Sequence, residues 1–169
     1  CLGGTVTPAE LKSLTFFREG ERNLSGVPLN YLQDGDYQAL FWLEQLRQRL
    51  DSPIQIIRLA HPGKPTAIDW CCPGRKYREV VMEVLRLPTC SYGFYSGNSV
   101  HIDRREYAYL PARWLAIKEN ERHYLHERGL DKLAGSVANG WIYLAWDWDA
   151  LQLVIELAER KSGEVPVGV

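Results

Sequence analysis

Histidine and aspartate side chains whose spacing suits metal binding lie in the middle of this 169-residue chain. His61 and Asp69 flank a turn that we expect to join two strands, so both side chains can reach one rim of a sheet. His101 and Asp103 are two positions apart, and on a strand such residues project from the same face. Neutral imidazoles and one carboxylate, with a fourth position open, are the ligand set of a catalytic zinc ion. The pattern therefore predicts a zinc site made of His61, Asp69 and His101, and hydrogen-bonded structural histidines are the alternative.

The other histidines and the cysteines are weaker candidates for chemistry. His123 and His126 are three residues apart on an expected helix, but the charged residues around them are typical of a solvated face. No C-x-x-C pair occurs, which argues against a zinc site made of thiolates. A disulfide from Cys71 or Cys72 to Cys90 stays open, and the redox compartment of the protein stays open with it.

Aromatic residues gather between positions 141 and 148. Trp141, Tyr143, Trp146 and Trp148 have two interpretations, a platform that stacks on sugar rings and ordinary packing in a hydrophobic core.

The apolar pattern predicts the elements that position these side chains. Leucines recur at spacings of three and four between residues 40 and 50, as in the core stripe of an amphipathic helix. We expect helices at residues 34–50, 75–87, 111–129 and 147–157, with a first helix starting at Thr7–Pro8, and strands at 54–59, 66–71, 91–95, 99–103 and 141–146. Gly129 should end the helix at 111–129, and Asp147 or Asp149 should cap the last one. The order of these elements predicts an α+β fold, a small antiparallel sheet with helices packed on one side.

Length and charge exclude several classes of protein. A chain of 169 residues is long enough for one domain with a real core, and we expect residues 1–169 to form a single domain. Twenty basic and 21 acidic residues exclude the broad positive field that non-specific nucleic-acid binding needs. No apolar stretch approaches the roughly 20 residues of a membrane span. Because the sequence begins with Cys1 and not Met, we expect a segment upstream of it, and a lipid-anchored start is one alternative.

Two segments match a known family of enzymes. Ala67-Ile68-Asp69, followed by Pro73-Gly74, fits the second half of the motif S-x-H-x-x-G-x-A-x-D, and the span from His61 to Asp69 is one residue longer than in that motif. A β-bulge can absorb such an extra residue. Val100-His101-Ile102-Asp103-Arg104 with Trp114 fits a closing strand that carries V-H-x-D, then Arg and Trp. Over roughly residues 38–115, the chain resembles the M15 family of zinc D-Ala-D-Ala carboxypeptidases and murein endopeptidases, in particular its small lysin-like branch.

The resemblance implies a zinc-dependent peptidase that hydrolyses peptide bonds of peptidoglycan stem peptides. His61, Asp69 and His101 are then the ligands of Zn²⁺, and Asp103 is the candidate for proton transfer. In a variant of this assignment, Asp103 is the ligand and His101 moves the proton. Arg58 corresponds to the arginine that holds a substrate carboxylate or the developing oxyanion, with a plain salt bridge as the alternative. Tyr95 is a second candidate for substrate contact.

The resemblance also implies a location and leaves rival functions open. It favours a cell-envelope, secreted or phage-borne protein, whose partner is a peptidoglycan peptide. The main rival is a catalytically inactive domain of the same fold that binds cell-wall peptide or a protein partner. A structural or assembly protein of a virus, with its histidines in the core, is a third interpretation. Residues 116–169 are expected to be a helical and aromatic extension of the family-like core.

Overall fold

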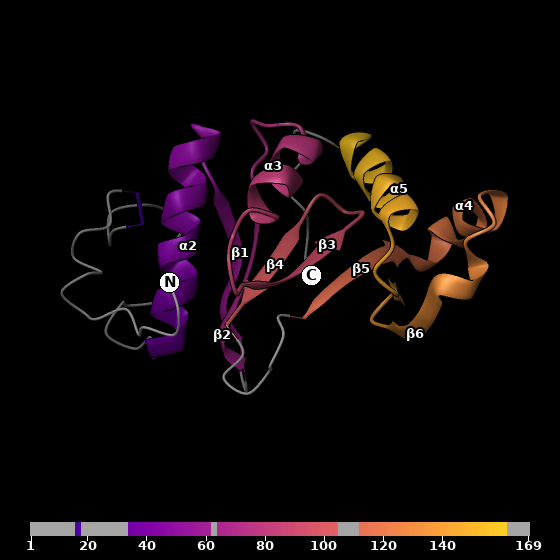
Figure 1. Cartoon of the computed structure of the whole chain (residues 1–169), viewed down its shortest axis with the longest axis horizontal. Coiled ribbons are helices and arrows are strands. Elements are labelled where there is room, and N and C mark those ends of the chain that lie inside the picture. Colours follow the sequence, from indigo (N-terminus) through magenta and orange to yellow (C-terminus); the bar gives the residue numbers. More distant parts are fainter. Residues whose placement is uncertain (1–15, 18–33, 62–63, 105–111, 162–169) are drawn as a thin grey trace.

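The structure is a computed structural model that describes residues 16–17, 34–61, 64–104 and 112–161. The expected helix start at Thr7–Pro8 lies outside these residues. The helices are α2 (Asp34–Leu50), α3 (Tyr77–Val84), α4 (Arg122–Glu127) and α5 (Trp148–Glu159), and two short 3₁₀ helices are η3 (Glu119–Glu121) and η4 (Asp131–Leu133). The strands are β1 (Gln55–His61), β2 (Lys64–Cys71), β3 (Ser91–Tyr95), β4 (Val100–Asp103), β5 (Arg113–Lys118), β6 (Ala134–Ala138) and β7 (Trp141–Leu144) (Figure 1).

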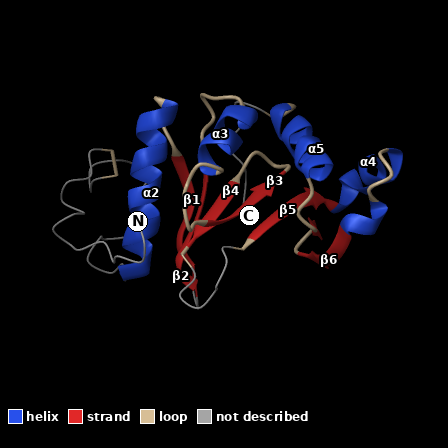
Figure 2. Cartoon of the chain, viewed as in Figure 1, coloured by secondary structure: helices blue, strands red, loops and turns tan. Residues whose placement is uncertain are grey.

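Among the described residues, seven strands form one open sheet in the order β1-β2-β4-β3-β5-β7-β6, of which Figure 2 labels β1 to β6. Neighbouring strands are antiparallel except β3 and β5, which are parallel. Helices pack against this sheet, so the predicted α+β class is confirmed. The sheet is larger than the small one that the sequence pattern predicted, because β5 and β6 join it.

The helices and one face of the sheet share a single hydrophobic core. Alternate residues of β2, Ile68 and Trp70, belong to it together with Leu43 of α2 and Val81 of α3. Figure 1 shows α3 and α5, which contact each other, side by side above the strands. Burial of each large apolar side chain stabilises the folded state by about 1.5–3 kcal/mol. Because successive side chains of a strand point to opposite faces, Asp69 faces away from this core.

The helix expected at residues 111–129 is wrong for most of its length. Arg113–Lys118 is strand β5, which lies between β3 and β7 and has three successive buried residues, 115–117. Such a run lacks the alternation that marks a half-exposed strand, so local pattern does not separate it from a buried helix. Gly129, at φ 66°, is left-handed after α4, as predicted for a helix end. Strand β6 was not predicted, because its alanines and glycine have low strand propensity.

The C-terminal elements belong to the same sheet and core. Strand β7 pairs with β5, and α5 contacts both β3 and β5. Asp147 caps α5, since its Oδ1 accepts hydrogen bonds from the backbone N–H groups of Asp149 at 2.9 Å and Ala150 at 3.0 Å. This confirms the predicted start of the last helix. Over the described ranges, no helix is both long and apolar enough to cross a bilayer.

Candidate functional site

Asp69, His101 and Asp103 form a buried carboxylate–imidazole–carboxylate cluster on the sheet face opposite the helices. The Nδ1 atom of His101 lies 2.7 Å from Oδ1 of Asp69, and its Nε2 atom lies 2.9 Å from Oδ2 of Asp103. The exposed fractions of the three residues are 1% for Asp69, 6% for His101 and 4% for Asp103. The predicted proximity of these three side chains is therefore present, with the imidazole in the middle.

The register of the sheet explains why these residues meet. Asp69 on β2 is the direct partner of His101 on β4, and His101 is the partner of Gly93 on β3. Gly93 is in turn opposite Trp114 on β5, and Arg58 on β1 is opposite Asp69. Residues directly opposite each other project from the same face. One row across five strands thus runs from an exposed arginine, through the buried cluster, to an aromatic residue.

Gly93 allows an indole ring to lie against the imidazole. A Cβ atom at this position would be 2.3 Å from the ring of Trp114, far inside van der Waals contact. The ring centroids of His101 and Trp114 are 5.0 Å apart, and Nε1 of Trp114 donates to Oη of Tyr95 at 3.1 Å. Gly93 was not predicted to be part of the site, although a glycine inside a strand is a known sign of close approach by another group.

Two opposing effects set the protonation of His101. Burial by itself lowers the pKa of the imidazole, and the two hydrogen-bonded carboxylates of Asp103 and Asp69 outweigh it, so the net pKa is raised above 6.5. Both contacts are hydrogen bonds with ionised carboxylates only when both ring nitrogens carry a proton. The cluster therefore favours an imidazolium held between two carboxylates.

His61 and Arg58 lie on β1, whose pairing with β2 is irregular. The register shifts between Ile56 and Arg58 and again between Leu59 and His61. His61 is three positions beyond Arg58, which corresponds to about 10 Å along a strand. The side chain of His61 lies outside the described residues, so its predicted role as a ligand stays a prediction.

The side chains of the cluster carry the kinds of ligand atom that zinc ions bind. Their hydrogen bonds to one another limit how a metal could bind there. An imidazole nitrogen and a carboxylate oxygen are ordinary zinc ligands, and Asp69 and His101 place one of each in contact. In the part of the chain that the structure describes, no group of three His, Cys, Asp or Glu side chains is arranged to hold a metal. A metal on His101 would have to replace a proton on one ring nitrogen, while the other nitrogen keeps its carboxylate partner.

The three described cysteines are free and buried, so the disulfides left open by the sequence are absent among them. Burial raises the pKa of Cys71 to about 12 and also raises that of Cys72, and the pKa of Cys90 is well above its usual value. Their thiolates are therefore disfavoured, which argues against a nucleophilic cysteine.

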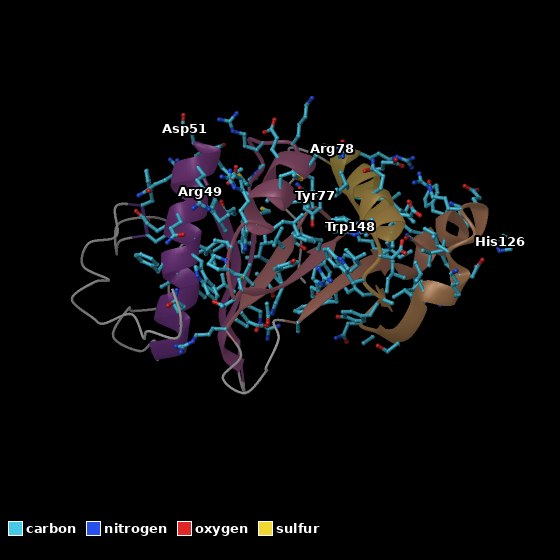
Figure 3. The ribbon with its side chains drawn as sticks, in the orientation of Figure 1. Arg49, Asp51, Tyr77, Arg78, His126 and Trp148 are labelled. Carbon is cyan, nitrogen blue, oxygen red and sulfur yellow. The ribbon has the colours of Figure 1, made fainter. Side chains whose placement is uncertain are left out.

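His123 and His126 lie on the surface and have different neighbours. The ring of His123 contacts the ring of Tyr124 at a tilt of 39°, with centroids 4.0 Å apart, and Nδ1 of His126 lies 3.2 Å from Oδ2 of Asp131. Figure 3 shows His126 on α4 pointing away from the body of the protein.

The aromatic residues of the C-terminal segment divide between two places. Trp141 and Tyr143 pack with Tyr95, which is 5% exposed, on the face that carries the buried cluster. Trp146 packs on the helix-side core and contacts Trp148, which is 65% exposed. The interpretation of these four residues as one sugar-stacking platform is therefore wrong.

Comparison with known proteins gives no match of this chain to a family model, to a curated protein or to a solved structure. The resemblance to the M15 peptidases therefore stays a prediction from the residues that carry it.

Proposed function

We propose that this protein is a zinc-dependent peptidase acting on peptidoglycan stem peptides, with His61, Asp69 and His101 as the ligands of Zn²⁺. The observation that carries the proposal is the contact of His101 with Asp69, which the pairing of β2 with β4 brings together in a buried position. A buried imidazole and carboxylate beside an exposed arginine, all on one row of the sheet, suit a site that combines metal binding with anion recognition.

The bound ion would polarise the scissile carbonyl and lower the pKa of a water molecule toward about 7. Asp103 accepts the hydrogen bond of the ring nitrogen that faces away from Asp69, so it fixes the orientation and the tautomer of His101. It is also the nearest carboxylate to which that nitrogen can pass a proton, at 2.9 Å.

Arg58 and Tyr95 have separate parts in substrate recognition. Arg58 is exposed at the edge strand and shares a row with Asp69, where its guanidinium can hold a peptide carboxylate with two parallel hydrogen bonds. Tyr95 is buried, and its hydroxyl accepts from the indole of Trp114, so we propose that Tyr95 acts by orienting that ring beside His101.

A second candidate is a catalytically inactive domain of the same kind that binds cell-wall peptide or a protein partner. The observation that favours it is the engagement of both ring nitrogens of His101 by carboxylates. Such a closed network also serves as a structural link between β2 and β4, because buried charged groups are stable only when they are paired.

Hydrolysis of a synthetic stem peptide ending in D-Ala-D-Ala, in the presence of added Zn²⁺, separates the two candidates. Wild type and the control His126→Ala, which removes an exposed histidine, should release product at equal rates. His101→Ala should abolish release. If wild type binds the peptide without cleaving it, and His101→Ala binds it equally well, the inactive domain is the correct function.

A further inference from the structure

The turn from Tyr95 to Ser99 joins the strand of Gly93 to the strand of His101. Within it, the Tyr95 N–H donates to the carbonyl of Ser99 at 3.2 Å, and the Asn98 N–H donates to the carbonyl of Tyr95 at 3.2 Å. Asn98 has a left-handed backbone at φ 72° and is 3% exposed. A buried non-glycine residue in this conformation persists only where its surroundings hold it.

One side chain from outside the hairpin binds both ends of this turn. The hydroxyl of Tyr77, at the start of α3, donates to the carbonyl of Ser99 at 2.7 Å and accepts from the N–H of Tyr95 at 3.0 Å. This N–H is shared between the Tyr77 hydroxyl and the Ser99 carbonyl. Figure 3 labels Tyr77 at α3, the helix to which it belongs. The residue is 1% exposed, and burial raises the pKa of its phenol, so the hydroxyl keeps its proton. A single buried oxygen thus links α3 to β3 and to the start of β4.

Polar groups from other elements also hold the same turn. Ser96 Oγ donates to Glu121 at 2.6 Å, and the Ser96 N–H donates to the carbonyl of Ala116 at 3.0 Å. Lys161 donates to the carbonyl of Ser96 and to Glu121, each at 3.1 Å. The turn is therefore held by contacts from several elements, and Tyr77 supplies the contact from α3.

The position of the turn determines where His101 stands. Gly93 and His101 are direct partners across the hairpin. Tyr95 is two residues after Gly93, and Ser99 is two residues before His101, so the turn begins and ends at the same distance from this pair. Because a shift of one residue moves every side chain to the other face, the contact with Asp69 requires the present register.

We propose that Tyr77 is a positioning residue whose hydroxyl holds the turn and thereby holds the His101 ring against Asp69 and Asp103. The importance of this role for activity rests on the proposed function, but the role itself is tested on metal-free protein.

The test compares Tyr77→Phe with Val84→Ala at a fixed pH, using NMR signals of the His101 ring N–H groups and the backbone amide of Tyr95. Tyr77→Phe removes one oxygen, whereas Val84→Ala shortens a fully buried residue of the same helix, so it reports general destabilisation. Sodium sulfate, which strengthens burial, is added to all samples so that each variant is measured in its folded state.

In Tyr77→Phe, the His101 ring signals should shift or broaden, and the Tyr95 amide should exchange faster than the variant's loss of global stability explains. In Val84→Ala, the ring signals should stay as in wild type, and the Tyr95 amide should change only as far as the loss of global stability requires. Unchanged ring signals in Tyr77→Phe, or an equal change in Val84→Ala, would overturn the proposal. Failure of wild type to bind zinc would overturn the proposed function alone, because the ring signals are read without metal.

Discussion

Asp69 and His101 are separated by 32 residues of sequence and meet through a 2.7 Å contact between Oδ1 and Nδ1. Each lies on the sheet face opposite the helices, and each is a direct partner of the other in the register of β2 and β4. The second ring nitrogen of His101 lies against Asp103 of its own strand. The imidazole is therefore held in one orientation before any ligand arrives, which is the requirement for a preorganised site.

Replacing Asp103 with Asn should weaken zinc binding without removing it. The hydrogen bond that orients a metal-binding histidine typically accounts for about 10–100-fold in metal affinity. Titration calorimetry of Zn²⁺ into metal-free protein should show a loss of that size in Asp103→Asn. The control Asp131→Asn, which changes the surface partner of His126, should bind as wild type does. Complete loss of binding in Asp103→Asn would instead make Asp103 a ligand, and unchanged affinity would contradict its orienting role.

The stability of the metal-free protein should fall as the pH rises above 6.5. Folding raises the pKa of His101, because its carboxylate partners outweigh the effect of burial. A raised pKa stabilises the folded state fully below the unfolded value of 6.5, and this contribution is lost as the pH rises through the folded value. Urea unfolding at several pH values measures the free energy of unfolding, and an NMR titration of the His101 ring shows whether this residue causes the change. In His101→Gln, the free energy of unfolding should depend less on pH above 6.5 than it does in wild type. A His101 midpoint below 6.5 would be evidence against the assignment.

Gly93→Ala should destabilise the protein by displacing an aromatic ring. The added Cβ atom would lie 2.3 Å from Trp114, so the indole must move away from His101. Overpacking of this kind costs about 1–3 kcal/mol. Urea denaturation should show that loss in the single variant and a smaller one when Gly93→Ala is made in a Trp114→Ala background. Equal losses in both backgrounds would show that the two residues do not interact.

Cys71, Cys72 and Cys90 should resist alkylation in the folded protein. All three are buried and free, and burial raises the pKa of Cys71 to about 12, so little thiolate is present at neutral pH. After treatment with iodoacetamide, mass spectrometry of peptides should find these positions unmodified. In denaturant, all three should react. Rapid modification of Cys71 under folded conditions would show that its surroundings open to solvent.

The sequence was sufficient to predict the hairpins and to predict that the site residues share one face of the sheet. Alternation places His101 and Asp103 on one face, and turn formers separate the strands that carry Asp69 and His101. The helix cap at Asp147 was also predictable, because it depends on contacts within three residues along the chain.

Features that depend on distant pairing were not predictable. Strand β5 is buried at residues 115–117, so its pattern contains no alternation, and its identity comes from pairing with β3 and β7. The approach of Trp114 to His101 depends on the same parallel pairing and on the absence of a side chain at Gly93. Neither relationship leaves a periodic signal in the local sequence.

Zinc content measured on protein purified without chelator is the most direct test of the proposed site. Wild type should contain about one zinc per chain, or reach that ratio when Zn²⁺ is added, since one site of three protein ligands is proposed. Asp69→Asn and His101→Ala should each lose the metal while His126→Ala keeps it. If wild type contains almost no zinc and takes up none on addition, the proposed metal site is contradicted.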